Sequence, residues 1–275
     1  MRNRKPGRKL SVVPIKRLVL FLSNSVLGGV SLAAGVGVQP ALSPMLRWMF
    51  GYNILRSSGL GFVGAVAGGL GWILSMAFRQ AVSLALLGKG SLLFVGATIG
   101  ALLASILLKK AALPKRLTAT LGTMLCVYTL LAASSISEFY PHGKFSSFEL
   151  NVLVSGLSAG VLARLLQLPG GLLMVPACFW LSRYGAHLSI ASSVLGTSLA
   201  AFLPAYSCLK KQERNEYETV ILLSGITAGI VAEQLCRALG ERALLIYAMV
   251  VALFFTAREM ADAVISPSRS ESLER

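Results

Sequence analysis

Long stretches of this chain carry no charged side chain, and each is long enough to cross a lipid bilayer as a helix. Roughly 17–25 apolar residues in helical conformation span the hydrocarbon core of a membrane. Uncharged, mostly apolar runs cover residues 18–46, 57–78, 90–108, 117–137, 165–182 and 184–209. The pattern predicts an all-α, polytopic membrane protein.

Composition and charge agree with this prediction. Of the 275 residues, 55% are hydrophobic and 13% are charged, whereas soluble domains carry about 25% charged residues. The net charge is +15, and all 11 acidic residues lie at or after Glu138. Because Lys and Arg form short clusters between the apolar runs, we expect them to set topology at a lipid bilayer. A soluble enzyme is excluded, and nucleic acid is not expected as a partner.

Few residues are suited to metal or redox chemistry. The 4 cysteines form no C-x-x-C pair, and the chain has only 2 histidines. Scattered cysteines within apolar runs favour packing thiols over disulfides or a zinc site. We therefore expect no enzymatic activity, no metal and no cofactor.

The chain contains an internal repeat. The sequence S-S-x-L-G occurs at residues 57–61 and again at 192–196, each copy after a proline-containing apolar segment. Downstream, G-A-T-I-G at 96–100 is echoed by G-I-T-A-G at 225–229. Duplicated halves are typical of secondary transporters, in which the halves meet at the substrate site.

The distribution of basic residues favours two inverted repeats of about five membrane segments each, with a broken helix in each half. If the segments around Pro40 and Pro176 cross the membrane fully, the cluster 109–116 and both termini lie in the cytosol with most of the Lys and Arg. If those segments only re-enter, the chain crosses about eight times instead of about ten, and this cluster lies outside. We prefer full crossing, and re-entry remains the alternative.

These boundaries divide the chain into segments. We expect a basic cytosolic N-terminus (1–17), a first membrane repeat (18–136), a linker loop (137–147), a second membrane repeat (148–262) and a polar C-terminal tail (263–275). The first apolar run is longer than a signal-peptide core and is followed by further spans, so it is interpreted as an uncleaved helix. The expected location is the bacterial inner membrane.

Glycine spacing predicts close helix contacts. G-x-x-x-G patterns occur at Gly64/Gly68, Gly96/Gly100, Gly156/Gly160 and Gly225/Gly229. Small residues at this spacing let two helix backbones approach each other in lipid. We expect packing within the chain, with a homodimer interface as the alternative.

A Pro-Gly-Gly break interrupts the apolar sequence of the second half. Residues 168–176 read L-P-G-G-L-L-M-V-P, which a continuous helix does not accommodate. Broken backbone at membrane depth lines a cavity or is buried in protein. A half-helix that begins after Gly170 and Gly171 would direct its free N–H groups at an anion. The alternative is a kinked structural helix.

Together with H-L-S-I-A-S-S at 187–193, this break resembles the motif of the TauE/SafE sulfite exporter family of bacterial permeases. The resemblance covers both halves and departs from the family at Leu168-Pro169. In the first half, residues 34–40 read A-G-V-G-V-Q-P, and Tyr52 stands at the position that matches His187. The resemblance implies two related halves and the export, or uptake, of sulfite and small organosulfur anions.

Candidate substrate-binding groups are backbone amides and hydroxyls. The residues are Gly170, Gly171, Ser57, Ser58, Ser192, Ser193 and His187. Serines in membrane helices also bond their own backbone or a neighbouring helix, so a packing role stays open. His187 has three readings: an anion donor, a proton acceptor or an ordinary interfacial histidine. Glu233, at the end of an apolar run, is a candidate for proton coupling, against the alternative of a helix-end carboxylate.

The function expected from these features is secondary active transport, as an exporter, of a small anion such as sulfite or an organosulfonate. Alternating access between the two halves would move the anion. The alternative is a non-transporting membrane scaffold or assembly protein whose glycines serve packing alone.

Overall fold

The computed structural model describes residues 12–79, 84–107, 148–166, 174, 175, 178, 185–211 and 217–265. Every element within these ranges is helical, which confirms the all-α class. Within the described residues, 4 helices are long and apolar enough to cross a membrane: Pro14–Ala33, Arg56–Ala77, Leu86–Ala104 and Glu218–Ala238. Their length and composition suit a membrane protein, as expected from the uncharged runs.

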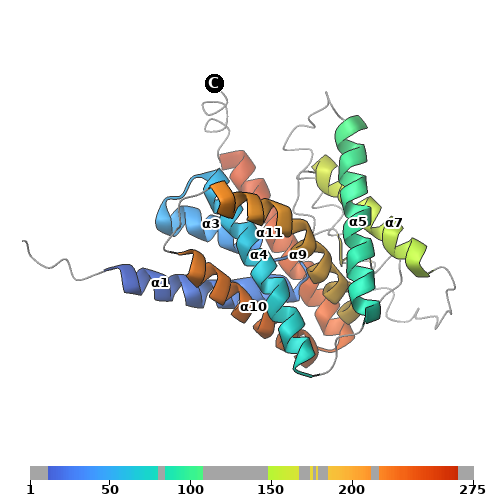
Figure 1. Cartoon of the computed structure of the whole chain (residues 1–275), viewed down its shortest axis with the longest axis horizontal. Helices are drawn as coiled ribbons and strands as arrows, with labels where there is room; N and C mark the ends of the chain where they lie inside the picture. The colour runs from blue at the N-terminus through green and yellow to red at the C-terminus, as the bar shows by residue number, and fades with distance from the viewer. Residues whose placement is uncertain are drawn as a thin grey trace, which may run out of the picture.

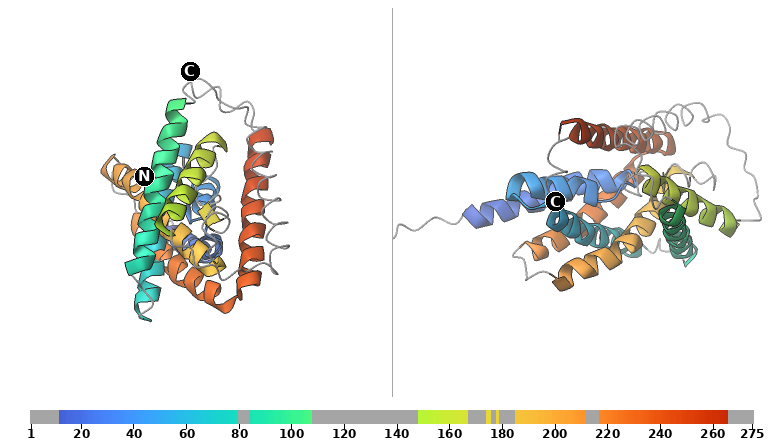
Figure 2. Two further views of the ribbon diagram at one scale, coloured as in Figure 1. Left: turned by 90° about the vertical axis from the view of Figure 1, so that its right-hand side faces the viewer. Right: turned by 90° about the horizontal axis from the view of Figure 1, so that it is seen from above.

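The helices of the first half are coloured from blue to green in Figure 1, with only short connections between them in the sequence. They are α1 (Val12–Ser23), a π-helical turn η1 (Asn24–Gly28), α2 (Gly29–Ala33), α3 (Gln39–Phe50), α4 (Ile54–Ala77) and α5 (Leu84–Leu107). Those described in the second half are α7 (Phe148–Leu166), α9 (Ala186–Lys211), α10 (Glu218–Ala238) and α11 (Glu241–Ile265). The left view of Figure 2 has α5 and α11 on opposite flanks of the molecule.

Local sequence signals place the boundary between α3 and α4. Gly51 ends α3 with a φ of 66°, and its N–H donates to Arg47 O at 3.0 Å. This left-handed conformation suits glycine because it has no Cβ. Asn53 then caps α4, since its side-chain oxygen accepts the Arg56 N–H at 2.8 Å. The turn between the two helices is therefore specified by Gly51 and Asn53.

Helices α4 and α10 run parallel, with their backbones in direct contact. A Cβ added to Gly229 would lie 2.1 Å from Gly68 O, and one on Gly71 would lie 2.0 Å from Ile226 O. One on Gly225 would lie 2.9 Å from Gly64 O. The glycines therefore permit an approach that any side chain would prevent.

Helices α5 and α7 make the equivalent contact with their own glycines. A Cβ on Gly100 would lie 2.1 Å from Leu157 O, and one on Gly160 would lie 2.1 Å from Ala97 O. Each G-x-x-x-G pattern identified in the sequence therefore packs against another helix of the same chain, which confirms that expectation.

The remaining contacts fix the helix directions. Gly59 of α4 faces Cys208 of α9, and Gly69 faces Ser198, so α4 and α9 run antiparallel. Near the start of α5, Gly90 faces Leu195 of α9, and a few residues later Leu93 faces Gly196, so these two helices run in the same direction. Contacts of Gly28 with Ala228 and of Gly29 with Val231 likewise align α2 with α10.

Two bundles result, each with parallel members. One contains α1–α2, α4 and α10, and the other contains α5, α7 and α9, which run in the opposite direction. The bundles meet where α4 crosses α9. Each bundle therefore contains helices from both halves of the chain.

Helix α3 brings the chain back between two parallel helices. It runs antiparallel to α4, with Val38 beside Gly68 and Ser43 beside Ser57. Because α2 and α4 both run parallel to α10, the chain reverses direction between Ala33 and Ile54, and α3 packs against residues 57–68 of α4. The Pro176 segment, the linker 137–147 and most of the tail lie outside the described residues.

Candidate functional site

The centre of the first half is a short non-helical break between α2 and α3. Gly35 and Gly37 have φ values of 73° and 97°, a left-handed conformation that residues with a Cβ rarely adopt. Both glycines are buried. The break therefore places a helix C-terminus and a helix N-terminus, with partial charges of opposite sign, close together inside the protein.

Side chains from several helices satisfy the carbonyl oxygens in and beside the break. Donor and acceptor pairs are Tyr247 Oη to Val30 O, Cys236 Sγ to Ala33 O, Ser193 Oγ to Gly35 O, Ser31 Oγ to Gly37 O, and Arg258 Nη1 to Pro40 O, at 2.6–3.3 Å. The donors come from α2, α9, α10 and α11. Buried carbonyls are costly to leave unpaired, so these bonds hold the break in one conformation.

The amide groups of the break have a different environment. The N–H groups of Gly35 and Val36 bond to carbonyls of α2. Within the described part of the chain, the N–H groups of Gly37, Val38 and Gln39 have no acceptor. No side chain caps α3, and a Cβ on Gly37 would find no described atom within 4 Å. The first N–H groups of α3 are thus bonded to no described acceptor, and N–H groups at a helix start suit an anion.

The break of the first half touches the corresponding region of the second half. A Cβ on Gly35 would lie 2.2 Å from the side chain of Val175, the residue before Pro176, and 3.5 Å from Ser193 Oγ. Gly170 and Gly171 lie outside the described residues. The break of the first half therefore contacts Val175 and lies beside Ser193 of α9.

The serine pairs lie on either side of this centre. Ser193 Oγ donates to Gly35 O at 2.9 Å, and Ser58 Oγ accepts from Gln39 Nε2 at 3.3 Å. The buried Ser192 hydroxyl has no partner among the described residues. Ser57 is buried, and its carbonyl accepts from Ser43. One serine of each pair therefore contacts the break or the first residue of α3.

His187 lies away from the break, at the start of α9. Its Nε2 is 2.9 Å from Cys236 O, and its Nδ1 is 2.9 Å from Glu241 Oε1. Both ring nitrogens are therefore engaged within the protein, and neither is directed at Gly35.

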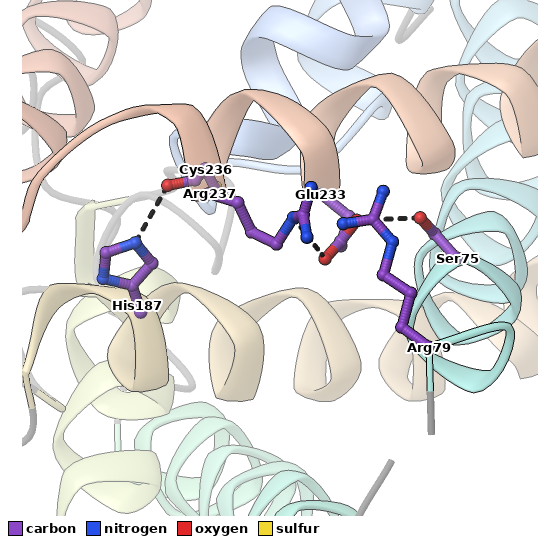
Figure 3. A network of polar contacts seen from close by, with 6 residues as sticks. All are labelled: Ser75, Arg79, His187, Glu233, Cys236 and Arg237. Atoms are coloured by element: carbon purple, nitrogen blue, oxygen red, sulfur yellow. Dashed lines mark hydrogen bonds and ion pairs between the residues drawn. The ribbon is translucent and has the colours of Figure 1, made fainter. Parts of the chain in front are cut away.

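Glu233 forms a polar cluster that joins α10 to α4 (Figure 3). Its buried carboxylate accepts from Ser75 Oγ at 2.8 Å and forms ion pairs with Arg79 at 3.8 Å and Arg237 at 3.5 Å. Two guanidinium groups against one carboxylate leave the cluster with a net positive charge. Buried charges are stable when they are paired and hydrogen bonded, so this arrangement stabilises the α4–α10 contact.

Sequence reasoning missed two polar residues of the interior. Arg258 of α11 donates to Pro40 O at 3.1 Å and lies 5.6 Å from the centre of the Trp48 ring. Asn24 is 1% exposed within η1, and its Nδ2 donates to Ser224 Oγ at 2.7 Å. The available signals were an asparagine inside an apolar run and an arginine at the end of one, since polar residues in membrane helices mark functional or packing positions.

Metal binding has no support in the described ranges, where no group of three His, Cys, Asp or Glu is placed to hold an ion. No protein-family model, curated protein or solved structure matches this chain. The function is therefore inferred from the geometry of the chain itself.

Proposed function

We propose that this protein is a secondary carrier, an exporter that moves a small anion across the bacterial inner membrane by alternating access. We also propose that it is related to the TauE/SafE sulfite exporters, which its second-half motif resembles. The observation that carries the proposal is the reversal of helix directions between the matched halves.

Exchange of the two halves turns two helix contacts into two others. The S-S-x-L-G copies lie on α4 and α9, which are antiparallel, and the G-x-x-x-G echo pairs α5 with α10. Under this exchange the parallel α4–α10 contact becomes the parallel α9–α5 contact. The contact of α10 with α2 likewise becomes that of α5 with α7. This correspondence supports an inverted repeat of the kind used by carriers with alternating access.

Charge supports the proposed orientation. Arg47, Arg56 and Lys210 lie at one end of the bundles, where α3 and α9 end and α4 begins. The N-terminal basic segment leads into α1 at this same end. Arg79 and Arg237 lie at the opposite end with the Glu233 carboxylate. The end that carries more basic residues is assigned to the cytosol.

The chemistry at the centre suits a small oxyanion. The start of α3 supplies N–H donors and the positive end of a helix dipole, equivalent to about half an elementary charge. Ser58 adds a hydroxyl beside Gln39, the first residue of α3, and Ser192 adds a buried hydroxyl on α9. Arg258 donates to Pro40 O and adds a positive charge at the start of the same helix. Sulfite and organosulfonates are the substrate class that the family resemblance implies.

The test is counter-flow of labelled sulfite and labelled methanesulfonate in proteoliposomes containing the full-length protein. Saturable uptake of either anion is the expected result. Gly37→Ala should reduce this uptake strongly because it places a methyl group beside the free amides. Gly51→Ala is the matched control, since Gly51 also has a positive φ and open space beside it but lies at the far end of α3. Absence of saturable flux in the wild-type protein would instead support the membrane scaffold.

A further inference from the structure

The geometry of the contact between His187 and Glu241 suits an imidazole that carries hydrogens on both nitrogens. Nε2 faces the carbonyl oxygen of Cys236, which can only accept, so Nε2 carries a hydrogen. Nδ1 lies 2.9 Å from Glu241 Oε1, and a carboxylate oxygen also accepts. Both contacts are satisfied together when the ring is an imidazolium beside a carboxylate. A neutral ring with the same partners would place the Nδ1 lone pair against a negative charge.

This pair joins the ends of three helices. His187 is in the first turn of α9, Cys236 is in the last turn of α10, and Glu241 is the first residue of α11. The second oxygen of Glu241 accepts the N–H of Ala186 and thereby caps α9. The pair therefore fixes the start of α9 against the turn between α10 and α11.

Helix α9 connects the pair to the central break. Ser193, which donates to Gly35 O, lies about 9 Å further along the same helix, at a rise of 1.5 Å per residue. Release of the α9 start would therefore act on the segment that borders the proposed anion site. The side chains of His187 and Glu241 are 39% and 51% exposed, so water can deliver and remove the proton.

The charged groups described on the helices next to His187 have other partners or are exposed. On α10, Glu233 and Arg237 pair with each other, and Arg79 adds a second guanidinium to Glu233. On α11, Arg242 is exposed. A proton on Glu233 would break two ion pairs inside the protein, which makes this carboxylate a poor carrier of protons.

From this geometry we infer that the His187–Glu241 pair is the proton-binding site that couples the carrier to the proton gradient. The inference rests on the proposed function and assigns the coupling role to this pair in place of Glu233. In the coupling step, the Nδ1–H bond of the imidazolium breaks and the proton passes to water. The electron pair stays on Nδ1, the imidazole becomes neutral, and the contact with the Glu241 carboxylate is lost.

The first experiment measures proton movement together with flux of labelled methanesulfonate in proteoliposomes. A sulfonate stays a monoanion over the whole working pH range, so any proton that accompanies it is carried by the protein. Wild-type protein should move protons in a fixed ratio to sulfonate. His187→Gln and Glu241→Gln should lose this proton movement and lose accumulation driven by a pH gradient, while counter-flow continues.

Two control variants separate this role from a general charge effect. Arg242→Gln changes an exposed charge next to Glu241 and should keep the wild-type ratio of protons to sulfonate. Retention of this ratio in both His187→Gln and Glu241→Gln, or its loss in Glu233→Gln alone, would overturn the inference and leave the carrier function intact. Absence of sulfonate and sulfite flux in the wild-type protein would overturn the carrier function, and the inference with it.

A second measurement does not depend on transport. The chain has only 2 histidines, so His142→Gln leaves His187 as the single imidazole in the full-length protein. Nitrogen NMR of the ring should detect protons on both nitrogens, and Glu241→Gln at the same pH should convert the ring to the singly protonated form. A singly protonated ring with Glu241 intact would overturn the inference.

Discussion

Replacement of Gly229 by alanine tests the packing of α4 against α10. The new Cβ would lie 2.1 Å from Gly68 O and 2.6 Å from Trp72 N, both backbone atoms, whereas ordinary contact begins at 3.4 Å. No side-chain rotation relieves this clash, so the two helices must separate by about 1 Å. Overpacking of this kind costs about 1–3 kcal/mol. Alanine also favours the helix over glycine by about 0.8–1 kcal/mol, which opposes the clash.

Gly88→Ala is the matched control because it gains the same helix propensity. The gain therefore cancels when the stabilities of the two variants are compared. Gly88 also lies within a helix, but no described atom is within 4 Å of its added Cβ. The free energy of unfolding of both variants can be measured by titration with SDS in mixed micelles. Gly229→Ala should be less stable than Gly88→Ala by about 1–3 kcal/mol. A difference below about 0.5 kcal/mol, within the range of neutral surface changes, would refute the backbone contact between α4 and α10.

Substitutions at Ser193, Glu233 and Arg258, with matched controls, test the polar contacts. Ser193→Ala should weaken sulfite affinity about tenfold or more in counter-flow, whereas Thr197→Val, whose hydroxyl bonds only carbonyls of its own helix, should stay within about twofold. Glu233→Gln should lower the free energy of unfolding in SDS by about 1–3 kcal/mol, because two guanidinium groups lose their counter-charge. Arg258→Met should raise the sulfite concentration needed for half-maximal flux several-fold, and Arg258→Lys should restore much of it, since an ammonium group can still donate to the same carbonyl.

The helices and their glycine contacts followed directly from sequence pattern. Uncharged runs predicted the long apolar helices because membrane thickness sets a minimum length. The G-x-x-x-G spacing predicted close backbone contact because only a missing Cβ permits it. The glycines of residues 34–40 likewise indicated a break, and two of them have the positive φ that only glycine tolerates well.

The partners of the polar side chains could not be predicted in the same way. His187 was considered for anion binding, yet its ring bonds to Cys236 and Glu241, which are distant in sequence. Glu233 was considered for proton coupling, and the structure pairs it with Ser75 and two arginines. Pairing of this kind depends on which helices become neighbours, and that depends on packing across the whole chain.

The contact between α4 and α10 can form only late in synthesis of the chain. The glycine surface of α4 is complete early in synthesis, but its partner α10 begins only at Glu218. At 5–20 residues per second, the ribosome needs roughly 7–30 s to reach α10 after α4. During this interval Gly71 of α4 lacks the Ile226 backbone that it contacts in the folded protein, whereas Gly64 and Gly68 already have Val38 of the earlier chain as a neighbour.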